Sequence, residues 1–235
     1  MNAIILAAGM GKRFNRITRK IHKALLPVGG VPNIERTINY LNEFGVDKVI
    51  IVTGYKSESF DYLREKYGCE LILNENYYNY NNIYSFYKAI NYFNDSFVID
   101  ADVVLFENIF KSSQKSFYYT IQRPVSDDLE WVPIVNRQGR VISVDITDDY
   151  KPSMLGISYW NSSDCKFIRN NLNSYLDKKT LSNKKLYWDN IMIDLLDRIY
   201  VKTVIVPPDS ASEMDNMDDY EDICKIIEKR NEKIN

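Results

Sequence analysis

Residues 2–13 read NAIILAAGMGKR: the short apolar run 2–7 ends in small residues, and a loop with two glycines and two cations follows it. Such a run is typical of a buried parallel strand. Further apolar strands are expected at 48–53, 71–73 and 97–99, with an amphipathic helix before each of them. Strands and helices that alternate in this way predict a parallel, Rossmann-like sheet.

The pattern changes beyond about residue 112. Extended segments are expected at 116–123, 131–136, 140–146 and 154–160. Gln138 and Gly139 are predicted to form the turn between the middle two. Helices are expected at about 162–176 and 185–199, then a strand at 202–206 and a terminal helix. We therefore expect an α/β fold with a mixed, mainly parallel central sheet and a small antiparallel extension.

Composition and charge exclude several classes of protein. The 235 residues are 45% hydrophobic and 26% charged, which is typical of one soluble globular domain. Charges of both signs are interspersed around a net charge of -2, so no nucleic-acid partner is expected. No apolar stretch approaches the roughly 20 residues of a membrane span. We expect a cytoplasmic protein without membrane insertion, and a homodimer remains open.

The loop after the first strand has the chemistry of a phosphate-binding site. Gly9 and Gly11 allow backbone amides to approach an anion closely, and Lys12 and Arg13 can form charge-assisted hydrogen bonds with phosphate oxygens. A surface turn with two solvated cations would have the same residues. The loop lacks the G-x-G-x-x-G motif of dinucleotide sites and the G-K-[ST] ending of P-loops.

Residues 3–30 resemble the signature of the sugar-phosphate and alcohol-phosphate nucleotidyltransferases, L-A-A-G-x-G-x-R followed by P-K-A-L. The resemblance implies that the loop and its arginine hold a triphosphate, and that Lys23 bridges the α-phosphate and the incoming phosphate. The nucleotide-binding residues would be Leu6, Ala7, Ala8, Gly9, Gly11, Lys12 and Arg13, together with Asp100.

The signature is not complete in this chain. His22 replaces a proline before Lys23, and Arg16 stands where a proline often occurs. His22 is the only histidine. We do not assign it as a general base, because a phosphate monoester is already an anion at neutral pH.

Two acidic clusters are candidates for a metal site. Asp100 and Asp102 end the strand at 97–99, and alternation would place both carboxylates on one face. Glu213 and Asp215 precede the terminal helix, where helix capping is the competing interpretation. The resemblance implies that Asp102 and Asp215 hold Mg²⁺, with Asp100 and Glu213 beside them.

Segments along most of the chain are similar to bacterial CTP:phosphocholine cytidylyltransferases, namely 81–85, 98–102, 130–131, 156–160 and 186–190. A quaternary ammonium donates no hydrogen bond, so aromatic faces and a carboxylate must hold it. The acceptor-site candidates are Glu130, Trp131, Tyr187 and Asp189, with Tyr159 or Trp188 behind.

Two assignments near these segments have a competing structural interpretation. Trp188, Met192, Leu195 and Ile199 have helical spacing, which favours a core position for Trp188. Asn82 and Ser85 are candidates for contacts with the cytosine edge, and helix capping by Asn82 is equally compatible with the pattern.

The predicted function is transfer of CMP from CTP to phosphocholine, which gives CDP-choline and pyrophosphate with Mg²⁺ as cofactor. One domain, 1–235, would bind the nucleotide with about 1–110 and the acceptor with about 111–235. Phosphoethanolamine and 2-aminoethylphosphonate also fit as acceptors, and Asp127 could add a carboxylate for them. A hexose 1-phosphate acceptor is compatible with the signature too. So is a regulatory module that binds nucleotide but has lost catalysis.

Overall fold

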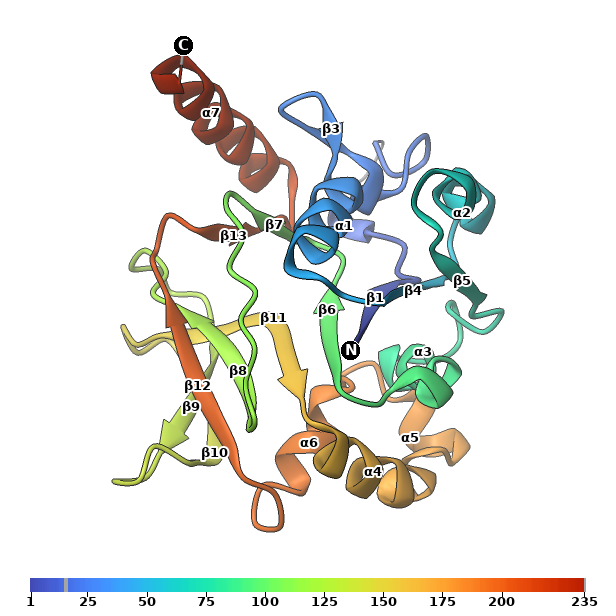
Figure 1. The fold of residues 1–235 in the computed structure, drawn as a ribbon, viewed down its shortest axis with the longest axis vertical. Coiled ribbons are helices and arrows are strands. Elements are labelled where there is room, and N and C mark those ends of the chain that lie inside the picture. Colours follow the sequence, from blue (N-terminus) through green and yellow to red (C-terminus); the bar gives the residue numbers. More distant parts are fainter. Residues whose placement is uncertain (15–16, 235) are drawn as a thin grey trace.

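The computed structural model describes residues 1–14 and 17–234, so Arg16 lies outside the described residues. Its centre is a seven-stranded sheet in the order β12-β8-β11-β6-β1-β4-β5 (Figure 1). The strands are β1 (Asn2–Ala7), β4 (Lys48–Thr53), β5 (Glu70–Leu73), β6 (Ser96–Asp100), β8 (Ser116–Ile121), β11 (Ser153–Trp160) and β12 (Val201–Val206).

The pairing of these strands confirms the predicted fold class. β6, β1, β4 and β5 are parallel neighbours, and β12 is parallel to β8. β11 runs antiparallel to both β6 and β8 and so joins the two parallel groups. The expected antiparallel extension is the pair β9 (Glu130–Val135) and β10 (Val141–Thr147).

Helices cover both faces of the sheet. Successive side chains of β1 point to opposite faces and pack into two different hydrophobic clusters. Ile5 packs with α1 (Asn33–Phe44) and α2 (Tyr62–Tyr67). Ile4 packs in the cluster of the opposite face. The helices that contribute to that cluster are α3 (Asn82–Lys88), α4 (Ser162–Asn171), α5 (Lys178–Ser182) and α6 (Asp189–Asp194).

The terminal helix α7 (Met217–Ile234) lies at one end of the molecule and projects beyond the sheet (Figure 1). Ile223 and Ile227 anchor it in a third cluster with Phe14 of the glycine loop. No described helix combines the length and the apolar composition that crossing a membrane requires.

The helix expected at 185–199 is the main error in the predicted elements. α6 covers only Asp189–Asp194, and α5 precedes it with Asp177 as its side-chain cap. Very short strand pairs were also not predicted. They are β2 (Pro27–Val28) with β3 (Val31–Pro32), and β7 (Val103–Leu105) with β13 (Ala211–Glu213).

Candidate active site

The glycine loop leaves β1 at the carboxyl edge of the parallel strands, over the buried residues Leu6, Ala7 and Ala8. Gly11 has a φ of 57°, and a Cβ there would lie 3.1 Å from Thr18 Cγ2 and 3.3 Å from Lys23 Cδ. A side chain at this position would therefore be strained and crowded.

A short 3-10 turn, Lys12–Phe14, follows the glycines and presents two exposed cations. Buried Phe14 fixes the turn, and the Phe14 N–H donates to Gly11 O at 3.0 Å. Lys12 Nζ lies 5.6 Å from the ring centroid of Tyr78. The loop thus has a fixed backbone and charged side chains at its surface.

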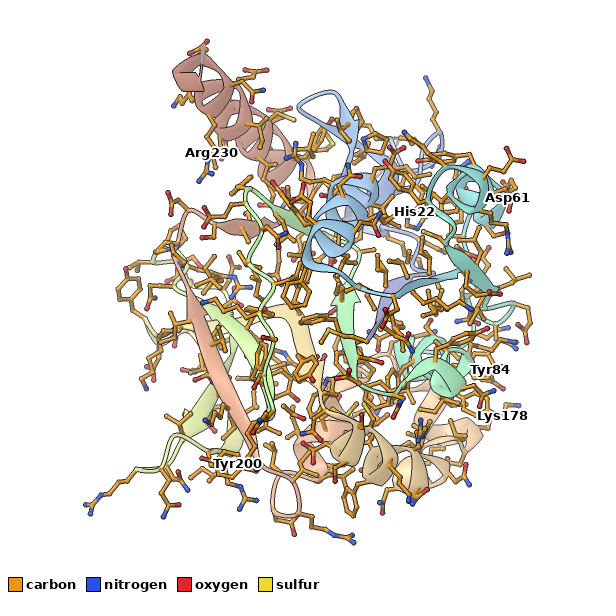
Figure 2. The ribbon with its side chains drawn as sticks, viewed as in Figure 1. His22, Asp61, Tyr84, Lys178, Tyr200 and Arg230 are labelled. Carbon is orange, nitrogen blue, oxygen red and sulfur yellow. The ribbon has the colours of Figure 1, made fainter. Side chains whose placement is uncertain are left out.

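His22 lies inside the molecule and braces this loop (Figure 2). Its Nδ1 accepts from the Ala24 N–H at 3.1 Å, so its Nε2–H donates to Gly9 O at 2.8 Å. Burial lowers the pKa of His22 to about 4 despite the bond to Gly9. The neutral ring is therefore a structural link between the glycine loop and the turn Lys23–Leu25.

Lys23 and Asp102 form a close ion pair, with Lys23 Nζ 2.6 Å from Asp102 Oδ2. Burial disfavours the charged form of each group, but the opposite charge outweighs it. The pKa of Lys23 is raised and the pKa of Asp102 is lowered relative to their ordinary values. Both groups are therefore ionised at neutral pH.

Asp215 reaches the same region through the β7–β13 pair, in which Glu213 lies opposite Val103. The Met214 N–H then donates to Asp102 O at 3.0 Å, and Arg13 binds the Asp215 carboxylate at 2.8 Å. Asn216, not Asp215, caps the start of the terminal helix by accepting from the Asp218 and Asp219 N–H groups, and Asp219 accepts in return from the Asp215 and Asn216 N–H groups. The side chain of Asp215 is thus available to the site.

The expected alternation of Asp100 and Asp102 along one strand is only partly correct. β6 ends at Asp100, and Asp102 lies in the turn that leads into β7. Gly156 of β11 has a φ of 68° and lies against Asp100, where a Cβ would be 3.3 Å from Asp100 Oδ2. Burial, and next the charge of Asp102, raise the pKa of Asp100 well above its ordinary value.

Arg123 is a site residue that sequence reasoning missed. Its guanidinium binds Glu213, donates to Met154 O at 2.9 Å and lies 3.3 Å from Glu130. Burial raises the pKa of Glu213 to about 7 although Arg123 opposes the shift. The only signal in the sequence was a cation at the end of a largely apolar extended segment.

Trp131 and Tyr187 come together from distant parts of the chain. Their ring centroids are 5.8 Å apart and the planes are at 89°, an edge-to-face pair, and Tyr187 remains 47% exposed. Asp189 is buried nearby in sequence at the start of α6, and burial raises its pKa to about 7. Its charge also acts on Asp100, which connects this group to the carboxylates at the end of β6.

Trp188 occupies the core as its helical spacing indicated, with its ring 5.5 Å from that of Phe86. Asn82 accepts from the Trp188 N–H at 2.8 Å, whereas Asn81 caps α3. Asn82 therefore does not cap the helix. It ties the start of α3 to the segment that carries Tyr187.

One predicted site residue, Tyr159, lies elsewhere, and another, Ser85, is buried. Tyr159 pairs with Phe97 because β11 is antiparallel to β6, and its hydroxyl donates to Asp95 at the opposite end of β6 from Asp100. Ser85 is buried and accepts from Asn74 Nδ2 at 2.9 Å. We therefore withdraw Tyr159 as an acceptor contact, whereas the contact of Ser85 with the cytosine edge stays a prediction.

A wide cleft of about 860 Å³ opens beside the carboxylates, between α7 and the segment before β9. It reaches Arg13, Asp215, Glu213 and Glu130 but is not lined by Gly9, Gly11, Lys12 or Tyr187. The position of the candidate site is therefore given by its charged and aromatic side chains, since the cleft covers only part of them.

The site combines a glycine-rich loop with exposed cations, at the edge of a parallel sheet, with the ion pairs Lys23–Asp102 and Arg13–Asp215. These features define a nucleotidyltransferase. The model of the MobA-like NTP transferase domain matches residues 3–110. The chain is 47% identical to the choline-phosphate cytidylyltransferase of Haemophilus influenzae, over 99% of this chain and 100% of that one. It is 35% identical to the Streptococcus pneumoniae enzyme of the same name, over 98% and 100%.

The solved structure of the Streptococcus pneumoniae CTP:phosphocholine cytidylyltransferase superimposes with a TM-score of 0.87, covering 96% of this chain and 98% of that one. A 2-aminoethylphosphonate cytidylyltransferase of Lancefieldella rimae is 29% identical over 92% of this chain and 89% of its own. The chain belongs to the choline-phosphate cytidylyltransferases.

Proposed function

We propose that this enzyme transfers CMP from CTP to phosphocholine. An oxygen of the acceptor phosphate attacks the α-phosphorus of CTP and forms a new P–O bond. The bond from that phosphorus to the oxygen that bridges to the β-phosphate breaks, and pyrophosphate leaves with the electron pair. The attacking phosphate is already an anion, so the reaction needs no general base, in keeping with the buried and neutral His22.

The observation that carries the choice of acceptor is the Trp131–Tyr187 pair near buried Asp189. Two aromatic walls and a carboxylate suit a trimethylammonium group, which has positive charge but no N–H to donate. Asp189 has a pKa raised to about 7 by burial, so a bound cation would favour its ionised form.

A primary ammonium would need hydrogen-bond acceptors as well as ring faces. Glu130 lies 3.3 Å from Arg123, so its charge is already compensated, and Asp127 is exposed on the segment before β9. These positions favour phosphocholine over phosphoethanolamine and 2-aminoethylphosphonate, although one relative is named for the last of these.

Catalysis of this kind depends on positioning and on stabilising the charge of the phosphates. We assign the distal phosphates to Lys12 and Arg13 of the glycine loop and the α-phosphate to Lys23. Lys23 forms an ion pair with Asp102, and Arg13 forms one with Asp215. When CTP binds, its phosphate oxygens would replace these carboxylates as partners of the two cations.

The donor set fits Mg²⁺. Asp102 and Asp215 offer only carboxylate oxygens, and the hydrogen bond from Met214 to Asp102 O holds their two segments together. Within residues 1–14 and 17–234 no group of three acidic, histidine or cysteine side chains could enclose a metal ion. Two carboxylates are what Mg²⁺ commonly takes from a protein, since phosphates and water complete its octahedron. Bound there, the ion would neutralise charge that develops on the phosphates.

The test is pyrophosphate release by the purified chain with CTP, Mg²⁺ and each of phosphocholine, phosphoethanolamine and 2-aminoethylphosphonate. We expect the highest kcat/KM with phosphocholine and a loss of activity when UTP replaces CTP. Failure with all three acceptors would refute an amino-alcohol substrate, and turnover of a hexose 1-phosphate would indicate a sugar nucleotidyltransferase instead. We also propose a cytoplasmic location for the reaction.

A further inference from the structure

Asn33 is a buried polar residue with no assigned part in the reaction. It opens α1, its exposed fraction is 0%, and Pro32 before it contributes no side-chain cap to the helix. An asparagine in such a place needs partners for its amide group, because an unpaired buried polar group is costly.

The Asn33 side chain bonds to the backbone on both sides of Asp102. Its Nδ2 donates to Val103 O at 2.9 Å and lies 3.3 Å from Ala101 O. Both acceptors are carbonyls, so only the NH₂ group of the amide can face them and the orientation is unambiguous. The turn that carries Asp102 is therefore held by one side chain at the residue before it and the residue after it.

The backbone of Asn33 holds the other member of the ion pair. Its N–H donates to Leu26 O at 3.0 Å, and the Leu26 N–H donates to Lys23 O at 3.1 Å. Lys23 begins the 3-10 turn Lys23–Leu25. The two hydrogen bonds through Leu26 hold this turn against the first residue of α1. One residue thus links the main chain of Lys23 to the main chain around Asp102.

The Asn33 amide oxygen has no hydrogen-bond partner among the described residues. A leucine has the same number of side-chain heavy atoms and would leave no buried oxygen unpaired, so packing alone does not explain an asparagine here. The two NH₂ contacts are what leucine lacks.

We propose that Asn33 is a positioning residue that sets the separation of Lys23 and Asp102. The inference rests on the proposed roles of these two residues in phosphate and metal binding. Residues that orient metal ligands commonly change metal affinity or activity by about 10- to 100-fold when they are removed. Asn33 contacts neither substrate nor metal in this role.

The test compares Asn33→Leu and Asn33→Ser with Thr37→Val, a buried polar residue one turn further along α1. Circular dichroism and the melting temperature establish that each variant is folded. Binding of Mn²⁺ in the presence of CTP, followed by electron paramagnetic resonance, measures the metal site without turnover. Steady-state kinetics give kcat and the KM for each substrate.

Both Asn33 variants should bind Mn²⁺ about tenfold or more weakly and lose kcat, with the KM for phosphocholine unchanged. Thr37→Val should match the unaltered chain. Asn33→Ser decides the matter if the larger leucine prevents folding. A folded Asn33 variant with unaltered Mn²⁺ binding would overturn the proposal, and so would an equal loss in Thr37→Val.

The unaltered chain separates this proposal from the proposed function. If it releases pyrophosphate and binds Mn²⁺ with CTP, only the role of Asn33 is at stake in the variants. If it binds no Mn²⁺ with CTP, the metal site of the proposed function is wrong and the positioning role falls with it.

Discussion

Replacing Trp131 with alanine is expected to weaken the binding of phosphocholine without affecting CTP. A cation against one ring gains about 0.5–2 kcal/mol, depending on how far the site is removed from water. Tyr187 is 47% exposed, so we take about 1 kcal/mol for the lost indole face, roughly a fivefold change. Loss of the edge-to-face contact also frees Tyr187, which could remove up to about 1 kcal/mol more.

The expected result is therefore a KM for phosphocholine that is roughly 5- to 30-fold higher. Pyrophosphate release would be measured with phosphocholine varied at saturating CTP, and then with CTP varied. Trp131→Phe keeps one aromatic face and should change the KM by about twofold or less. A fall in kcat with an unchanged KM for phosphocholine, or an equal rise in the KM for CTP, would refute the assignment of this wall to the acceptor.

Three further changes test other parts of the structure. Asp102→Asn should lower pyrophosphate release by about 100-fold or more in a folded protein, and unchanged release would contradict the metal assignment. His22 has a pKa lowered from 6.5 to about 4, so its contribution to stability is complete above pH 6.5 and is lost as the pH falls towards 4. In urea unfolding, the free energy of unfolding should fall by up to about 3 kcal/mol more between pH 7 and pH 4.5 in the unaltered chain than in His22→Gln. An equal fall in both proteins would disprove this role of His22. Glu35→Ala removes the acceptor of three hydrogen bonds between α1 and α2, from Tyr62, Lys66 and Tyr67. It should lower the free energy of unfolding by about 2–3 kcal/mol with KM values unchanged, and a thermal melt identical to that of the unaltered chain would contradict this.

The parts of the site that follow a long strand were predictable from the sequence. β1 has the bounds that its apolar run indicated, and the glycine loop leaves it at the expected edge. The local pattern is enough to predict this part, because an apolar run followed by glycines fits few structures other than a buried strand and a tight loop.

The meeting of Asp102 and Asp215 could be taken only from resemblance to a family. It depends on β7 and β13, which are three residues each and too short for any periodic signal. Arg123 was missed for a similar reason, since its partner Glu213 is 90 residues away in the chain.

The error at Tyr159 also has a physical cause. A segment such as 156–160 does not reveal the direction of its strand in the sheet, and antiparallel pairing moves its last residues to the far end of β6. Ser85 lies on the buried side of α3 and bonds to Asn74, and periodicity alone does not distinguish such a position from one that faces a ligand.

The β7–β13 pair has a consequence for the order of folding. Arg13 and Asp215 are separated by 202 residues, so the loop closed by their contact is nearly the whole chain. Contacts of such high sequence separation carry a large loop-closure entropy and form late. During synthesis the first four parallel strands can assemble long before residue 211 leaves the ribosome, so the Arg13–Asp215 contact, and with it the proposed metal site, can form only once the last tenth of the polypeptide is present.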